Sequence, residues 1–166
     1  MMLTLLAVIA VAVLAARLYM DRASETAVLP TENIAINSLR GPLAMNAFLA
    51  CPPGYCAVAP PLTSPEFPIP VERLYDAWLQ TIADEPRVTV LDTDPQRRRV
   101  IALQRSALFR FPDIIIAEFV ALGPQQSSLA VYSRSRYGQS DLGVNRKRVV
   151  AWLNDLRRST PPAIHP

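Results

Sequence analysis

Two amphipathic helical patterns enclose four strand-like runs between residues 70 and 158, and this order limits the fold more than any other feature. The first pattern repeats apolar residues three and four positions apart from Val71 to Ile82, after Pro70 and before Pro86. The second predicts a helix over Leu142–Arg158, with Ser140 or Asp141 available as its cap. Its apolar stripe consists of Val149, Trp152, Leu153 and Leu156.

The four runs between these helices are rich in residues typical of strands. They are Arg87–Asp92, Arg99–Ser106, Asp113–Leu122 and Leu129–Ser135. Their links are short, with turns at Asp94-Pro95 and Gly123-Pro124, and short links favour antiparallel neighbours. The order α-β-β-β-β-α therefore predicts an α+β fold, in which an antiparallel sheet of about four strands carries both helices on one face.

The N-terminus predicts an additional element, a transmembrane helix over residues 1–20. Met1–Ala16 contains neither charge nor proline, and the apolar run continues after Arg17. Twenty helical residues span about 30 Å, the hydrocarbon thickness of a bilayer, so the bilayer is an expected partner of residues 1–20. The alternatives are a cleaved signal peptide ending at Val13-Leu-Ala15, although no Lys or Arg precedes the apolar run, and a buried helix of a soluble protein.

The remaining residues divide into an arm, a domain and a tail. Residues 21–45 are rich in Pro and Ala and predict an extended arm, with a short helical turn near Asn33–Leu39. Residues 46–158 form one globular domain, which suits a chain of 166 residues, and 159–166 form a tail. Within the domain, Asn46–Pro70 is expected to be an irregular strap over the sheet.

The two cysteines predict a disulfide. In Cys51-Pro-Pro-Gly-Tyr-Cys56 a turn at Pro53-Gly54 can bring both Cα atoms within bonding range. A disulfide suits an oxidising compartment, which predicts a single-pass inner-membrane protein with an extracytoplasmic, periplasmic body. Arg17 and Arg22 point to the opposite orientation by the positive-inside rule, and two buried free thiols remain the alternative. No metal site is expected, because two thiols alone do not complete a tetrahedral site and the one histidine, His165, stands at the extreme C-terminus.

Positive charge is concentrated near the C-terminus. Residues 134–158 hold seven cations against Asp141 and Asp155, a sum of +5, so the other residues sum to −2 within a net charge of +3. Because the basicity is local, nucleic acid is not an expected partner. Arg134 and Arg136 share one strand face, and Asn145 and Arg148 lie one turn apart on the next helix. The backbone N–H groups at the start of that helix add positive potential.

This pattern predicts a site for a carboxylate, a phosphate or an acidic loop of a partner protein. The candidate residues are Arg110, Asp113, Arg134, Ser135, Arg136, Asp141, Asn145, Arg146 and Arg148. In the internal alternative, Arg134 or Arg136 pairs with Asp141 or Asp113, while Arg146 and Lys147 are solvated.

Two smaller basic features accompany this segment. Arg110 stands between two aromatic residues in the kinked connection Phe109–Asp113, which is either a structural corner or part of the same site. Arg97-Arg98-Arg99 lies at an expected hairpin tip, where it is either solvated or in contact with anionic headgroups.

No catalytic constellation is present in the sequence. It has no histidine placed for acid–base work, no glycine-rich phosphate loop and no nucleophile elbow, so neither an enzyme nor a cofactor is expected. Two function classes remain. One is a membrane-anchored accessory protein that docks its basic strand–loop–helix surface onto a membrane protein complex or an anionic ligand. The other is a carrier of a small ligand or lipid, with a cavity between sheet and helices.

Three motifs carry a resemblance to a known family. They are the pair Cys51 and Cys56, the run Leu108-Phe-Arg-Phe-Pro-Asp113, and the run Ser133-Arg-Ser-Arg-Tyr-Gly-Gln-Ser-Asp-Leu-Gly-Val-Asn-Arg-Lys-Arg148. From about Asn46 to Arg158 the chain resembles the bacterial and plastid proteins grouped as domain of unknown function 1499. Members of that family often begin with a hydrophobic or lipoprotein-like segment, which agrees with the expected anchor. The resemblance implies no known activity.

Overall fold

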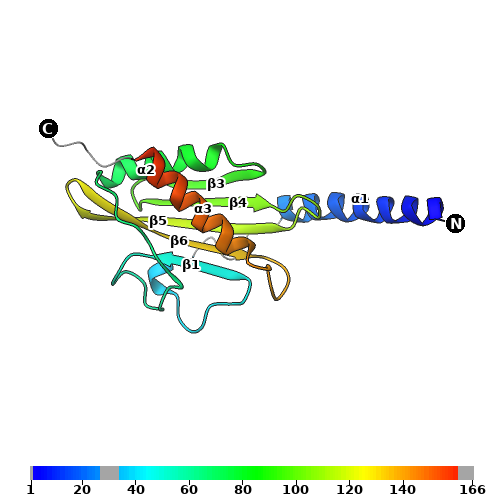
Figure 1. Cartoon of the computed structure of the whole chain (residues 1–166), viewed down its shortest axis with the longest axis horizontal. Coiled ribbons are helices and arrows are strands. Elements are labelled where there is room, and N and C mark those ends of the chain that lie inside the picture. Colours follow the sequence, from blue (N-terminus) through cyan, green and yellow to red (C-terminus); the bar gives the residue numbers. More distant parts are fainter. Residues whose placement is uncertain (1, 27–33, 161–166) are drawn as a thin grey trace.

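The computed structural model describes residues 2–26 and 34–160, and its centre is a six-stranded sheet with strand order β2-β1-β6-β5-β4-β3 (Figure 1). The strands are β1 (Ala47–Cys51), β2 (Leu62–Thr63), β3 (Val88–Asp94), β4 (Arg99–Arg105), β5 (Pro112–Gly123) and β6 (Gln126–Ser135). β1 and β2 pair in parallel, and all other neighbours are antiparallel, so the sheet is mixed.

Two helices cover one face of the sheet, α2 (Val71–Ala83) and α3 (Val144–Ser159). The apolar stripe of each helix is buried against the sheet, which is what an amphipathic pattern produces. Trp78 of α2 and Trp152 of α3 meet edge to face, with ring centroids 5.7 Å apart, and Trp78 also meets Phe119 of β5 at 6.3 Å. The helices and the sheet therefore enclose an aromatic core.

The opposite face is covered by segments with little regular structure. The 3-10 helix η2 (Ile36–Ser38) packs there with its fully buried Ile36, next to the loop closed by Cys51 and Cys56. These cysteines form a disulfide with Cα atoms 6.3 Å apart, as predicted. Glu118 of β5 is buried beneath both segments and accepts hydrogen bonds from the Ile36 N–H (3.0 Å) and the Tyr55 hydroxyl (2.8 Å). Its carboxylate thereby ties both segments to the sheet.

The predicted fold class is wrong in the number and direction of strands. The four expected strands are present as β3 to β6, and both helices lie on one face, but β1 and β2 arise within the strap Asn46–Pro70 that we expected to be irregular. β1 has only five residues and precedes two prolines, so no local period identifies it. Its strand conformation depends on the backbone hydrogen bonds that it makes with β6.

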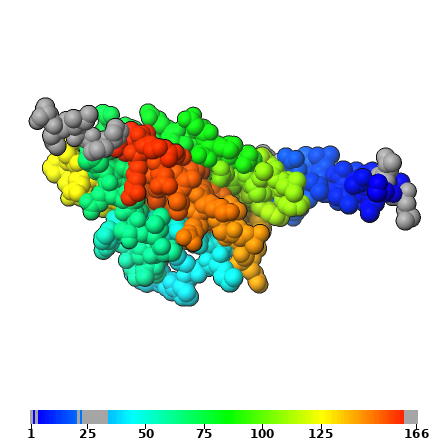
Figure 2. Space-filling model, viewed as in Figure 1, coloured from blue at the N-terminus to red at the C-terminus, as the bar shows by residue number. Residues whose placement is uncertain are grey.

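The predicted transmembrane helix is also wrong. α1 (Met2–Thr26) is helical and projects from one end of the molecule (Figures 1 and 2), but within residues 2–26 and 34–160 no helix is long and apolar enough to cross a membrane. Its charge-free run ends at Ala16, and sixteen helical residues span only about 24 Å. The single-pass inner-membrane localisation is therefore corrected as well. The predicted arm and tail lie partly outside the described residues, at 27–33 and 161–166.

Candidate functional site

The end of β6 separates the candidate residues onto two faces of the sheet. Ser133 and Ser135 are buried on the face that α3 covers, where Asn145 contacts both of them. Arg134 alternates to the other face, that of Tyr132, and is only half buried. The sheet thus divides Arg134 from Asn145 and Arg148, so these residues do not surround one common ligand position.

Arg148 of α3 is the centre of a buried polar network. Its Nη2 lies 2.6 Å from Oδ2 of Asp113 on β5, and both side chains are less than a tenth exposed. Nη1 donates to Ser133 Oγ at 2.9 Å and to Asn145 Oδ1, while Nε donates to Gln104 Oε1. A buried charge needs such compensation for its lost hydration. This guanidinium is therefore neutralised inside the protein.

Asn145, one turn before Arg148, is fully buried, and its side-chain amide joins α3 to β6 and to the residue before β1. Oδ1 accepts from Ser133 Oγ at 2.6 Å, and Nδ2 donates to Ser135 Oγ at 3.1 Å and to the Asn46 carbonyl at 3.0 Å. Asn46 in turn donates from Nδ2 to the Gly138 carbonyl at 2.6 Å. The network therefore fixes the first turn of the loop that follows β6.

Asp141 fixes the other end of that loop. Its Oδ2 accepts from the Asn145 N–H at 2.7 Å and its Oδ1 from the Gly143 N–H at 3.0 Å. These are unpaired backbone groups at the start of α3, and a carboxylate there is favoured by the helix dipole. The capping role predicted for Asp141 is confirmed in this form, although the residue stands two positions before the helix cap Gly143.

The cations around the loop remain accessible to different degrees. Arg146 and Lys147 are exposed on the first turn of α3, and neither makes an ion pair with any residue that the structure describes. Arg136 is half buried, with its guanidinium 5.7 Å from the centroid of the Tyr137 ring. Burial raises the pKa of Tyr132, and the nearby Arg134 acts in the opposite direction. Positive charge is thus exposed at Arg146 and Lys147 and only partly accessible at Arg136, whose Nη1 is buried without a hydrogen-bond partner among the described residues.

A second loop joins this one at the same end of the sheet. Residues 106–111 connect β4 to β5, and Phe109 and Phe111 stack there with ring centroids 5.6 Å apart. The Arg136 N–H donates to the Pro112 carbonyl at 3.1 Å and links the two loops. We call residues 106–111 together with 136–147 the loop end of the sheet. α1 projects beyond this end in Figure 1.

The structure brings the predicted residues together in a different way from either sequence interpretation. Asp113 pairs with Arg148 rather than with Arg134 or Arg136, and Asp141 caps a helix. Arg110 lies in the neighbouring loop, half buried. Sequence reasoning missed Gln104 and Asn46, because their contacts to α3 span 44 and 99 positions of the chain, respectively.

The triplet Arg97-Arg98-Arg99 lies at the opposite end of the sheet, where Arg97 and Arg98 stand in the turn between β3 and β4 and Arg99 begins β4. Arg97 lies 3.7 Å from Asp94 and Arg98 lies 3.5 Å from Glu72. Arg99 donates to the Ile34 carbonyl at 3.1 Å. These contacts tie the turn to α2 and to the segment that covers the second face.

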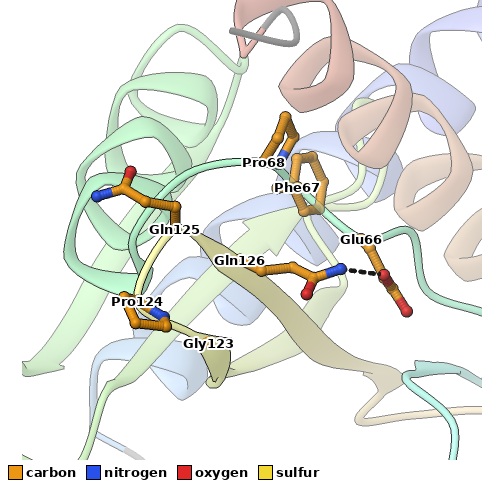
Figure 3. Close-up of a pocket in the computed structure, with 7 residues that line it drawn as sticks. All are labelled: Glu66, Phe67, Pro68, Gly123, Pro124, Gln125 and Gln126. Atoms are coloured by element: carbon orange, nitrogen blue, oxygen red, sulfur yellow. Dashed lines mark hydrogen bonds between the residues drawn. The ribbon is translucent and has the colours of Figure 1, made fainter.

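A surface hollow of about 480 Å³ also lies far from the loop end, between the turn of β5 and β6 and the segment before α2 (Figure 3). Phe67, Pro68 and Pro124 line it together with Glu66, whose carboxylate accepts from Gln126 Nε2 at 2.7 Å. The hollow thus offers apolar surface and one carboxylate, that of Glu66, which is already hydrogen-bonded to Gln126. Its lining contains no second titratable side chain that could act together with Glu66. In the part of the chain that the structure describes, no group of His, Cys, Asp and Glu side chains could hold a metal ion.

Comparison with known protein families assigns this chain to a family. Residues 49–156 match the family described as "Protein of unknown function (DUF1499)". No curated protein matches the chain.

Solved structures show weaker likenesses. The di-domain ARO/CYC protein BexL of the BE-7585A biosynthetic pathway is 12% identical, with a TM-score of 0.44 over 58% of this chain and 44% of BexL. A Thermobifida fusca protein is 10% identical, with a TM-score of 0.40 over 74% of this chain and all of that one. The protein TTHA0849 from Thermus thermophilus is 11% identical, with a TM-score of 0.28 over 59% of this chain and 88% of that one. The chain spans less than half of BexL, and TM-scores below 0.5 assign neither fold nor ligand here.

Proposed function

This chain belongs to the family described as "Protein of unknown function (DUF1499)", and we propose that it is a non-enzymatic docking protein that attaches to a negatively charged partner through its loop end. One observation carries the proposal. The loop after β6 is held by the buried network of Arg148 and Asn145, while Arg146 and Lys147 beside it are exposed. The sequence motif thus combines a rigid support with available positive charge.

The rigidity of the loop affects the affinity for a partner, whereas its positive charge affects how the partner approaches. A loop that is already ordered loses little conformational entropy when a partner engages it, which favours affinity. Exposed cations at one end of a molecule attract an anionic partner and orient it before contact. Both effects support docking as the role of this surface.

The aromatic core supports docking over the carrier alternative. A carrier needs space between the helices and the sheet, where Trp78, Trp152 and Phe119 meet edge to face. Trp78 and Trp152 are each 1% exposed, so they face neither solvent nor an open cleft. A ligand would have to displace these rings.

Crosslinking of the full chain in extracts of its own cells tests the proposal. Arg136→Ala, Arg146→Ala and Lys147→Ala combined should abolish crosslinks that the wild-type chain forms, because the charge that attracts the partner is gone. The matched control is Arg97→Ala, Arg157→Ala and Arg158→Ala, which removes as much charge away from the loop end and should leave the crosslinks in place. Unchanged crosslinks in the first variant, with an unchanged circular dichroism spectrum, would contradict the proposal.

A further inference from the structure

The loop end exposes apolar side chains beside its cations. On the 106–111 loop, on the loop before α3 and at the first residue of α3, large hydrophobic residues face solvent although the core of the domain is well filled. These residues are Leu108, Phe109, Phe111, Tyr137, Leu142 and Val144. Single exposed apolar residues are ordinary, but a group at one end marks an interaction surface.

Leu142 is the most informative member of this group. It is 89% exposed and adopts φ 54°, a left-handed conformation that a leucine side chain disfavours. Asparagine or glycine would be more stable in this conformation, and an exposed leucine makes no compensating contact with the core. Strain of this kind, observed at an exposed position, indicates a role outside folding.

Hydrogen bonds within the two loops hold these apolar side chains in exposed positions. Asp141 and the Asn145 network fix the loop that carries Leu142, and the Ser106 hydroxyl accepts the Phe111 N–H at 3.0 Å across the other loop. Phe109 and Phe111 stack on each other rather than folding back onto the sheet. The apolar side chains therefore stand at the tips of two braced loops instead of lining a groove.

Cations stand next to these apolar residues along the chain, a combination that a lipid headgroup layer favours. Arg136 precedes Tyr137, while Arg146 and Lys147 follow Val144 on the first turn of α3. Apolar and aromatic side chains can enter the boundary between headgroups and acyl chains, while long cationic side chains reach the phosphates. A fluid bilayer surface accommodates two protruding tips without a complementary groove.

α1 adds further exposed apolar surface next to the loop end. α1 projects from the loop end in Figures 1 and 2, and its large apolar side chains, including Leu5, Val8 and Leu18, are exposed. Met20 of α1, in contrast, is buried. Exposed apolar surface therefore extends along one end of the molecule.

We propose that the loop end docks peripherally on an anionic lipid bilayer, without spanning it. Phe109, Phe111 and Leu142 enter the headgroup layer, while Arg136, Arg146 and Lys147 contact lipid phosphates. This inference rests on the proposed docking function and names its partner as the bilayer surface.

Sedimentation of the full chain with vesicles tests the inference. Wild type should bind vesicles of phosphatidylcholine mixed with phosphatidylglycerol more tightly than vesicles of phosphatidylcholine alone. Replacing Arg136, Arg146 and Lys147 by Gln should weaken binding to the mixed vesicles about fivefold for each cation. Phe109→Ser with Phe111→Ser should weaken it more than about tenfold. The matched apolar control is Val90→Ser with Leu122→Ser, whose side chains have similar exposure elsewhere on the sheet and should not matter.

Leu142→Asn separates lipid binding from folding. Asn is better suited to the backbone at this position, so the variant should be at least as stable as wild type and yet bind mixed vesicles several-fold more weakly. If all loop-end variants bound like wild type, α1 would account for the binding and the inference would be overturned. A different result would separate the two proposals. If the wild-type chain did not bind vesicles but still formed crosslinks that require Arg146 and Lys147, the bilayer would be excluded as the partner and the docking function would stand.

Discussion

At the scale of residues, Arg148 determines what the basic motif can do. Its guanidinium is buried against Asp113, with Ser133, Gln104 and Asn145 as further acceptors. Removing one partner of such a pair leaves an uncompensated buried charge, whereas replacing both with apolar groups does not. The most buried cation of the motif therefore contributes to stability and loop order, and only its exposed neighbours are available to a partner.

Asp113→Asn should lower the free energy of unfolding by about 3–5 kcal/mol, because Arg148 is left buried without its counter-charge. Asp113→Leu combined with Arg148→Met should cost less than Asp113→Asn alone. Urea denaturation followed by circular dichroism measures both. Asp155→Asn is the control, since the Asp155–Arg158 pair is exposed and should change stability by less than about 1 kcal/mol. Equal losses in Asp113→Asn and Asp155→Asn would show that the buried pair has no special role.

At the scale of elements, η2 and the loop between Cys51 and Cys56, which lie on either side of β1 in the chain, cover a sheet face with hardly any regular structure. Three features hold them there: the buried Ile36, the disulfide, and the hydrogen bonds that Glu118 accepts. Burial raises the pKa of Tyr55, and the hydrogen bond to Glu118 raises it further. The folded state thus favours the neutral phenol over the phenolate.

This preference predicts a loss of stability in alkaline solution. Tyr55 in the unfolded chain loses its proton near its ordinary pKa of 10.0, while the folded chain retains it. The stabilisation is therefore complete below about pH 10 and is lost as the pH rises above that value. Tyr55→Phe should cost about 1 kcal/mol at neutral pH and should flatten the decline above about pH 10. Denaturation at a series of pH values measures the slope, and an unchanged slope would contradict the assignment to Tyr55.

At the scale of the whole molecule, the sheet has a covered face on each side and an exposed loop end. α2 and α3 close one face over an aromatic core, and the segment held by Glu118 closes the other. The central strands β4, β5 and β6 are therefore buried over most of both faces, whereas the edge strand β3 is largely exposed. The loop end is the surface that we propose for a partner, because the network beneath α3 orders its backbone and leaves cations and apolar tips exposed.

A filled core predicts that the wild-type chain does not carry apolar ligands. Titration with a fluorescent fatty acid should leave the emission of Trp78 and Trp152 unchanged, because their rings already occupy the space. Trp78→Ala should lose about 3–5 kcal/mol of stability and create a cavity. That variant is the positive control, since an apolar probe should bind to it. Saturable quenching in the wild-type chain would instead favour the carrier function.

Much of the domain could be predicted from its sequence, and the misses have physical causes. The strands β3 to β6 and both covering helices follow from periodic apolar residues bounded by turns, which are local signals. β1 and β2 are short, and they become strands only because β6 offers an edge for β1. The predicted anchor was wrong because an apolar run of sixteen residues is shorter than a bilayer is thick.

The sequence by itself determined the order of β3 to β6 and their helices, the disulfide, a cap at Ser140 or Asp141 and the local concentration of cations. Each depends on residues that are close together along the chain. Only the tertiary structure decided which cations are buried and which are exposed, because the partners of Arg148 come from β4, β5 and β6. Burial and long-range pairing are properties of packed elements, and no period or motif within one segment contains them.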